Sequence, residues 1–275
     1  MAFLIFLHEE LLQLVTQNLK THNNKMPKTV FITGATSGIG KACAEKFAAN
    51  NFNIIITGRR KEKLDILKIE LEKSYKINVI TLCFDVQNKK EVFAAIEKIP
   101  ESNIDILINN AGLALGKEAF DEADMDDWET MISTNVNGLL YSTRALLPQL
   151  KKAKGHIVNI GSTAGKEVYE NGNVYCATKF AVNALSQSMR IDLVKHGIKV
   201  TSINPGAVET EFSIVRFKGN VDKANAAYIG YKPLVAMDVA DTIYFACTLP
   251  SHVCINDLTM TCTQQANSTV FHKIE

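Results

Sequence analysis

The sequence contains no Cys-x-x-Cys pair, although it has 275 residues and six cysteines. Disulfide frameworks and zinc sites both depend on closely repeated cysteines, and no cluster of His, Cys and carboxylates with metal-ligand spacing occurs either. We therefore expect reduced thiols in a cytoplasmic protein and no metal site. The thiols are Cys43, Cys83, Cys176, Cys247, Cys254 and Cys262.

An excess of charge of one sign is also absent. The 30 Lys and Arg residues almost balance the 29 Asp and Glu residues, and no block of like charge stands out. This balance gives no reason to expect nucleic acid or an anionic membrane as a partner. The apolar run at 2–7 meets Glu9 and Glu10 at once and has no basic segment before it. It therefore predicts neither a signal peptide nor a membrane span.

No linker divides the chain, since it has no internal repeat, no low-complexity tract and no Pro/Gly/Ser-rich stretch. Its apolar content of 47% is sufficient for one large core. We interpret residues 29–275 as one domain and residues 1–28 as a dispensable N-terminal extension, with a natural start at Met26 as one explanation. A short amphipathic helix is the alternative for the extension.

From residue 29 onward, apolar β-rich runs alternate with helical patterns. Such alternation predicts an α/β fold with one doubly wound parallel sheet of about seven strands and helices on both faces. The segment 209–232 shows neither pattern and is expected to be irregular. Strands are expected at 29–33, 53–57, 79–84, 104–108, 156–160, 198–203 and 257–261, and helices at 39–50, 61–73, 89–98, 125–151, 175–193 and 237–248.

A glycine-rich turn follows the first expected strand and opens the first helix. This is the context of a dinucleotide-binding turn in a Rossmann-type sheet, where the glycines permit a tight turn and close approach to a pyrophosphate. A purely structural turn is the alternative. The residues concerned are Gly34, Thr36, Ser37, Gly38, Ile39 and Gly40.

The end of the second expected strand distinguishes between cofactors. Dinucleotide folds that select NAD place an acidic residue there to bind the ribose hydroxyl, whereas this chain has Arg59 and Arg60. Two guanidinium groups suit a 2′-phosphate, so we predict NADP(H). Two solvated arginines that open a helix are the alternative.

Tyr175 and Lys179 lie four residues apart at the start of an expected helix and therefore share one of its faces. A phenol titrates near ~10, and a neighbouring ammonium and a cationic ring could lower this toward ~7. The pair then becomes a general acid/base for neutral pH. A chance pair on a solvated helix face is the alternative.

Taken together, these motifs resemble the short-chain dehydrogenase/reductase family. The resemblance covers the chain from about residue 29 and rests on Gly34-x-x-x-Gly38-x-Gly40, the stretch 109–112, Ser162, Tyr175-x-x-x-Lys179 and Pro205–Gly206. Within the family, the stretches 109–116, 128–131, 160–165 and 211–219 resemble the NADP-dependent 3-hydroxy acid dehydrogenases that act on serine or L-allo-threonine. The leading 28 residues depart from that group.

The resemblance implies four catalytic residues. Tyr175 would transfer the proton, Lys179 would lower its pKa and bind the nicotinamide ribose, and Ser162 would hydrogen-bond the substrate oxygen. Asn135 would hold a water in the proton relay, with a capping or buried amide as the alternative.

The resemblance also implies the remaining cofactor contacts. Asn109 is expected to tie strands together and not to bind cofactor. The adenine and adenosine would meet Asp85, Val86 and Asn110, and the nicotinamide would meet Pro205, Gly206 and Val208.

The implied reaction is reversible hydride transfer between NADP(H) and the hydroxyl-bearing carbon of a small 3-hydroxy acid, such as serine, L-allo-threonine or 3-hydroxyisobutyrate. The segment 209–232 would be a substrate lid, and Arg216 would bind the substrate carboxylate together with Ser162 and Tyr175. Pairing of Arg216 with Glu211, or exposure to water, is the alternative.

Two other functions compete with this one. They are a broad NADPH-dependent carbonyl reductase and a non-catalytic NADPH-binding scaffold. Helices 125–151 and 175–193 resemble the family's dimer-forming helices, which implies a homotetramer.

Overall fold

The computed structural model of the chain describes residues 27–100 and 104–274. Of the extension expected at residues 1–28, residues 1–26 lie outside the described residues. That the extension is dispensable therefore stays a prediction. All six cysteines fall within the described residues, and all are free. Across the same residues, no helix has the length and apolarity to cross a membrane.

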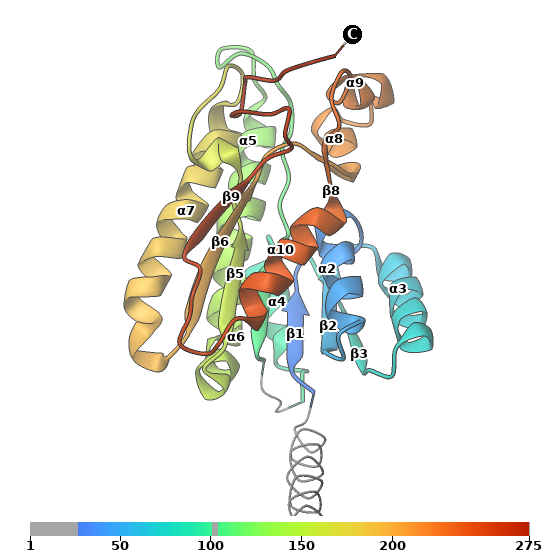
Figure 1. Cartoon of the computed structure of the whole chain (residues 1–275), viewed down its shortest axis with the longest axis vertical. Coiled ribbons are helices and arrows are strands. Elements are labelled where there is room, and N and C mark those ends of the chain that lie inside the picture. The colour runs from blue at the N-terminus through green and yellow to red at the C-terminus, as the bar shows by residue number, and fades with distance from the viewer. Residues whose placement is uncertain (1–26, 101–103, 275) are drawn as a thin grey trace, which may run out of the picture.

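A seven-stranded sheet forms the centre of the molecule, and its strands pair in parallel throughout (Figure 1). The strand order β3-β2-β1-β4-β5-β6-β9 confirms the predicted doubly wound sheet. β5 has the expected bounds, and the ends of the other strands differ from the expected ones by at most two residues. The bounds are β1 Thr29–Ile32, β2 Asn53–Gly58, β3 Val79–Cys83, β4 Ile106–Asn109, β5 His156–Ile160, β6 Lys199–Pro205 and β9 Asp257–Met260.

Two helical layers cover the two faces of this sheet (Figure 1). In β1, Val30 and Ile32 face one layer and Phe31 faces the other, as the period of two in a strand requires. Full burial of each such side chain contributes about 1.5–3 kcal/mol, which explains the continuous apolar runs. One layer consists of α2 (Gly38–Ala48), α3 (Lys61–Ser74) and α10 (Ala236–Thr248), and the other of α4 (Lys89–Ile96), α6 (Leu139–Ala153) and α7 (Asn173–Leu193).

The strand order reverses its direction next to β1. The chain builds β1, β2 and β3 outward to one edge and then returns, so that β4 lies on the other side of β1. The carboxyl ends of β1 and β4 therefore meet at a switch point, where open α/β sheets bind their ligands.

The expected single helix at 125–151 is interrupted. Between α5 (Met125–Ile132) and α6, residues Ser133–Gly138 form a wider π-helical turn. Asn135 is hydrogen-bonded there to the backbone of Leu113, and a Cβ on Gly138 would approach within 2.8 Å of the Val86 side chain. The sequence pattern missed the turn because these contacts come from distant segments. Such turns often mark functional sites.

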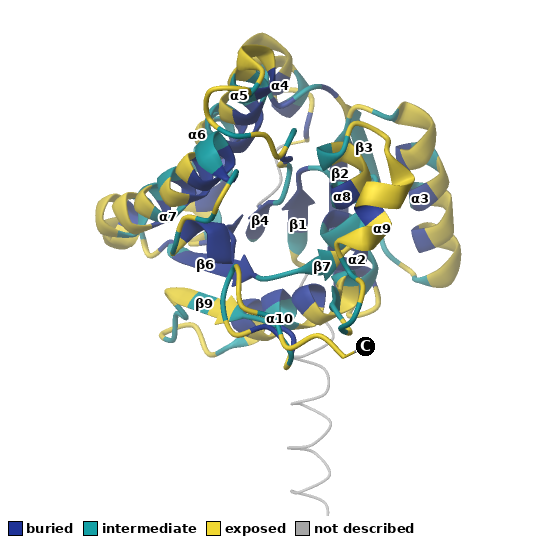
Figure 2. Cartoon of the chain, turned by 90° about the horizontal axis from the view of Figure 1, so that it is seen from above, coloured by how far each residue is buried: buried dark blue, intermediate teal, exposed yellow. Residues whose placement is uncertain are grey.

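The segment 209–232 is not irregular as predicted. It holds two short helices, α8 (Glu211–Arg216) and α9 (Val221–Ala226), with N-caps in which Thr210 accepts from the Phe212 N–H and Asn220 from the Lys223 N–H. Six residues are too few to show a helical period, which is why the pattern failed. The strands β7 (Val208–Glu209) and β8 (Leu234–Val235) pair in parallel at the base of the segment. Seen from above, α8 and α9 lie on the side of α3 and β2 (Figure 2).

Candidate active site

The turn between β1 and α2 has the backbone that a phosphate cradle requires. Gly34 and Gly38 have φ values of +66° and +54°, in the left-handed region that favours glycine. A Cβ on Gly40 would collide with the Gly34 carbonyl and the Asn110 amide, so α2 packs closely against the turn only because residue 40 is glycine. This geometry fits the prediction that the three glycines permit a tight turn and the close approach of a pyrophosphate.

Asn110, which follows β4, holds the turn in shape. Its Nδ2 donates to the carbonyls of Thr33 and Gly34 at 2.9 and 3.0 Å. The Thr33 hydroxyl in turn accepts from the backbone N–H groups of Asn110 and Ala111, each at 3.0 Å. The switch point between β1 and β4 is thus tied together by hydrogen bonds across it.

The two arginines after β2 have different surroundings. Arg60 donates to the Thr36 hydroxyl through Nη2 at 2.7 Å and through Nε at 3.1 Å, and to Ser37 at 3.0 Å. It also pairs with Glu211 at 2.8 Å. Arg59 is more exposed and lies 3.6 Å from the Asp85 carboxylate. Both guanidinium groups border the cradle, as the predicted 2′-phosphate site requires.

Ser162 stands at the end of β5, where its hydroxyl accepts from the Ala164 N–H at 3.1 Å. The preceding Gly161 donates to the Ile203 carbonyl at 2.8 Å, and a Cβ there would collide with the Asn204 amide. The Ser162 turn is therefore pressed against β6.

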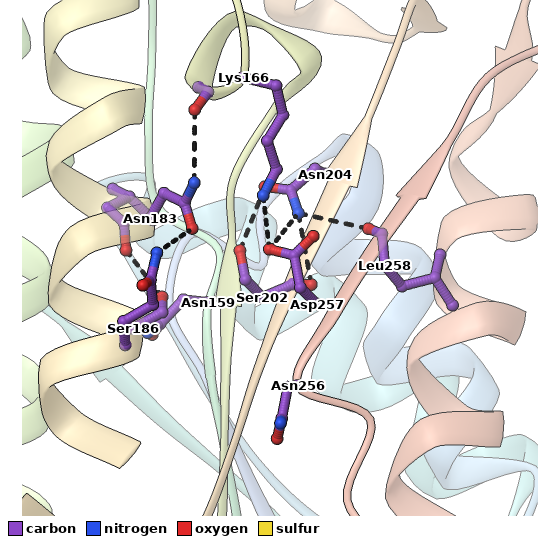
Figure 3. A network of polar contacts seen from close by, with 12 residues as sticks. Asn159, Lys166, Asn183, Ser186, Ser202, Asn204, Asn256, Asp257 and Leu258 are labelled. Carbon is purple, nitrogen blue, oxygen red and sulfur yellow. Dashed lines mark hydrogen bonds and ion pairs between the residues drawn. The ribbon is translucent and has the colours of Figure 1, made fainter. Parts of the chain in front are cut away.

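A polar network behind this turn links β6, β9 and the residue that follows the turn (Figure 3). Lys166 donates to the Asp257 carboxylate at 2.7 Å, and Asn204 donates to the same oxygen at 3.2 Å. The Ser202 hydroxyl donates to the side-chain Oδ1 of Asn204 at 3.1 Å. Asn204 and Ser202 are fully buried, so these satisfied bonds fix the position of β6 beneath Ser162.

Tyr175 and Lys179 lie in the first turns of α7, as predicted, and both are buried. The Lys179 ammonium is 5.9 Å from the centre of the Tyr175 ring and donates to the Ile160 carbonyl at 2.9 Å. Phe212 of α8 packs against the ring of Tyr175 at a centroid distance of 5.8 Å. The segment predicted as a lid therefore touches the tyrosine directly.

The pKa of Tyr175 differs from the prediction. Burial, with a smaller contribution from Tyr169, raises the pKa of Tyr175, while a hydrogen bond with Ser162 and the charge of Arg216 oppose the rise. Burial also lowers the pKa of Lys179 to about 8. The expectation that Lys179 lowers the pKa of Tyr175 stays a prediction, because in the chain by itself desolvation disfavours both charged forms and outweighs such an effect. The second cation of that expectation, the nicotinamide ring, remains a prediction.

Asn135 has its side chain fully engaged within the protein. Its Oδ1 accepts from the Leu113 N–H at 2.8 Å, and its Nδ2 donates to the Leu113 carbonyl and to Thr178 at 2.8 and 3.0 Å. The amide thus braces the 110–115 segment against α7, which matches the buried-amide alternative. The contact of Asn135 with a relay water stays a prediction. Asn109 links Thr143 and Asn159, each at 2.9 Å, which confirms its predicted role in tying strands together.

Arg216, at the end of α8, lies next to the tyrosine. Its guanidinium donates to the Tyr169 hydroxyl at 2.9 Å and to the Gly116 carbonyl at 3.3 Å. The guanidinium carbon is 5.5 Å from the centre of the Tyr175 ring. The alternative pairing with Glu211 is wrong, because Glu211 pairs with Arg60 and Lys63.

One cleft unites nearly all the predicted site residues. Gly40 and Asn135 lie behind its wall, and Arg216 stands beside Tyr175 without lining it. The predicted residues that line the cleft are Gly34, Thr36, Ser37, Gly38, Ile39, Arg59, Arg60, Asp85, Val86, Asn110, Ser162, Tyr175, Lys179, Pro205, Gly206 and Val208.

The sequence reasoning missed four lining residues of the lid, which are Thr210, Glu211, Phe212 and Val215. It also missed Tyr169, the partner of Arg216. Thr210 was detectable in principle, since a threonine followed by Glu and Phe is a helix N-cap pattern. Nothing local in the sequence marks Tyr169, because its contact with Arg216 spans 47 positions.

The chain is similar to known proteins over most of its length. The family profile described as short chain dehydrogenase matches residues 28–220. The NADP-dependent 3-hydroxy acid dehydrogenase YdfG of Salmonella typhi is 46% identical over 84% of this chain and 93% of the relative. The sulfoacetaldehyde reductase of Chromohalobacter salexigens is 43% identical over 88% of this chain and 96% of the relative.

A solved structure is similar as well. The closed form of serine dehydrogenase complexed with NADP⁺ is 43% identical, has a TM-score of 0.83, and covers 90% of this chain and 100% of its own.

Proposed function

The chain belongs to the short-chain dehydrogenase family, and from this premise we propose that it is an NADP-dependent oxidoreductase acting on small 3-hydroxy acids. The observation that carries the proposal is the meeting of Ser162, Tyr175 and Lys179 at the cleft, with the Arg216 guanidinium over the Tyr175 ring. The first three suit proton transfer at an alcohol oxygen, and the fourth supplies a cation beside it.

The residues around the cradle fit a dinucleotide. Gly34 and Gly38 open the backbone toward the pyrophosphate, and Arg59 and Arg60 provide two guanidinium groups for a 2′-phosphate. Asp85, Val86 and Asn110 would border the adenosine, and Pro205, Gly206 and Val208 the nicotinamide. When bound, NADP(H) supplies the hydride acceptor or donor.

Proton transfer is the task of the chain's own residues. Ser162 and Tyr175 both line the cleft and can share the substrate hydroxyl, which positions the oxygen where charge develops. In oxidation the Tyr175 phenolate, which Lys179 and the cationic nicotinamide ring would stabilise once NADP⁺ is bound, accepts the hydroxyl proton, and in reduction the phenol returns it. Lys179 places a positive charge 5.9 Å from the ring, and Phe212 excludes water from its face.

Arg216 is the proposed carboxylate contact. Its donors now engage two neutral oxygens, the Tyr169 hydroxyl and the Gly116 carbonyl, with no carboxylate of the described residues pairing with it. A cation held by neutral partners keeps its attraction for an anion. A substrate carboxylate near Tyr175 would form a charge-assisted, fork-shaped contact with it.

A second candidate is the reduction of a small aldehyde or ketone that carries an anionic group, because the same cation would serve it. The similarity to a sulfoacetaldehyde reductase supports that candidate.

We also propose that the protein is cytoplasmic and forms a homotetramer through the exposed sides of α5, α6 and α7, where Ile132, Leu140, Phe180 and Ile191 are exposed.

The test is a substrate panel with both cofactors. We expect NADP⁺ reduction with serine, L-allo-threonine and 3-hydroxyisobutyrate, and much lower kcat/KM with uncharged alcohols or with NAD⁺. Higher kcat/KM for sulfoacetaldehyde reduction than for 3-hydroxy acid oxidation would favour the second candidate. Absence of turnover on the whole panel would contradict both.

A further inference from the structure

Glu211 forms a charged contact across the mouth of the cofactor cleft. It is the first residue of α8, in the lid, yet one carboxylate oxygen pairs with Arg60 at 2.8 Å and the other with Lys63 at 2.8 Å. These partners lie 151 and 148 positions away, at the end of β2 and in the first turn of α3. Figure 2 shows α8 on the side of α3 and β2.

The same carboxylate is placed among the groups that face the cradle. Arg60 and Glu211 both line the cleft, together with Thr36 and Ser37. Hydrogen bonds from Lys63, Arg60 and Ser37 hold the pKa of Glu211 at about 2 despite its partial burial. Glu211 is therefore an anion at every working pH.

Arg60 has little capacity left for another anion. Its Nε and Nη2 donate to Thr36 and Ser37, and its Nη1 donates to Glu211. These bonds use four of its five N–H donors. An incoming phosphate that engages this guanidinium through two donors must therefore displace one of these partners, and the charged partner is Glu211. Lys63, by contrast, pairs with Glu211 through the opposite oxygen and does not line the cleft.

We propose that Glu211 is a specificity-determining residue of the lid: its carboxylate competes with the 2′-phosphate of NADP(H) for Arg60, and Lys63 retains α8 once Arg60 is taken. This inference rests on the proposed NADP(H) function. Glu211 also connects the phosphate end of the cleft with Tyr175, because the helix that begins with Glu211 places Phe212 and Arg216 against the Tyr175 ring.

The first test measures cofactor binding without substrate. Removing the charge with Glu211→Gln should tighten NADP⁺ binding by about threefold to fivefold, the range expected for partly exposed ion pairs. The Kd for NAD⁺ should not change, because NAD⁺ carries no 2′-phosphate. The matched control is Glu209→Gln, since Glu209 is exposed on the same segment and forms no ion pair within residues 27–100 and 104–274. It should leave both Kd values unchanged.

Three outcomes would overturn the inference alone: unchanged NADP⁺ binding in Glu211→Gln, weaker NADP⁺ binding, or equal tightening for NAD⁺. A wild-type protein that binds NADP⁺ no more tightly than NAD⁺ would instead contradict the proposed cofactor, and the inference with it. The two failures are therefore distinguishable from the wild-type ratio.

The second test follows the lid itself by amide hydrogen exchange over residues 211–217. Without cofactor, Glu211→Gln should exchange faster than wild type, because both pairs are lost. Lys63→Gln should accelerate exchange more strongly in the NADP⁺ complex than in the cofactor-free protein, where Arg60 still holds Glu211. An equal effect of Lys63→Gln in both states would overturn the proposal that Lys63 alone holds Glu211 once the 2′-phosphate has taken Arg60.

Discussion

Replacing Arg216 with methionine removes the lid cation while keeping a side chain of similar length. The change abolishes the bonds to the Tyr169 hydroxyl and the Gly116 carbonyl and the charge 5.5 Å from the Tyr175 ring. The bond from the Gly116 N–H to the Arg216 carbonyl, at 2.9 Å, uses only main chain and should persist. The end of α8 therefore keeps one of its anchors.

The expected magnitude follows from the lost contact with the substrate. A charged hydrogen bond contributes about 2–3 kcal/mol. This corresponds to a roughly 30- to 150-fold decrease in kcat/KM for serine or 3-hydroxyisobutyrate. An uncharged secondary alcohol has no carboxylate, so its kcat/KM should change less than about threefold by the same reasoning.

The assay is steady-state NADP⁺ reduction with a charged and an uncharged substrate for each variant. Lys218→Met is the matched control, because this lid cation pairs with Asp127 at 2.8 Å, away from Tyr175. It should affect both substrates equally and little. A uniform loss across charged and uncharged substrates in Arg216→Met would refute the carboxylate contact and indicate a role in lid folding.

Three further predictions concern other residues. Tyr175→Phe should lower kcat by about 10²–10⁴-fold while the Kd for NADPH stays within a few-fold, and near-normal turnover would contradict its role. Arg59→Ala combined with Arg60→Ala should raise the Kd for NADP⁺ by roughly tenfold to hundredfold without changing that for NAD⁺, and a parallel loss for both cofactors would contradict the phosphate site. Burial and the charge of Lys199 lower the pKa of His156 from 6.5 to about 3, so its stabilising effect is present above pH 6.5 and is lost as the pH falls toward 3. In urea titrations across that window, the unfolding free energy of His156→Gln should fall less than that of wild type, by on the order of 5 kcal/mol, and parallel pH curves would contradict this.

The parts of the fold that were predictable have local signals. A parallel strand such as β5 is buried on both faces and therefore appears as a continuous apolar run, and its bounds matched the expected 156–160. The turn from Gly34 to Gly40 was equally predictable, because positive φ angles and close packing select glycine at specific spacings. The placement of Tyr175 and Lys179 followed from helical spacing alone.

The parts that were not predictable depend on contacts between distant segments. The π-helical turn at Asn135 is held by Leu113 and Thr178, and neither contact leaves a periodic signal. The raised pKa of Tyr175 comes from burial, to which the lid residue Phe212 contributes through packing. Local sequence shows which groups are present at a site but not how far they are desolvated.

Transfer of an isotope label tests the central claim most directly. The wild-type protein is incubated with NADP⁺ and 3-hydroxyisobutyrate that carries deuterium on the hydroxyl-bearing carbon, and the mass of the NADPH formed is measured. We expect one deuterium in the NADPH from wild type. The Tyr175→Phe variant should form this labelled NADPH about 10²–10⁴-fold more slowly. Unlabelled NADPH from the wild type, or label transfer at an unchanged rate in Tyr175→Phe, would contradict this account.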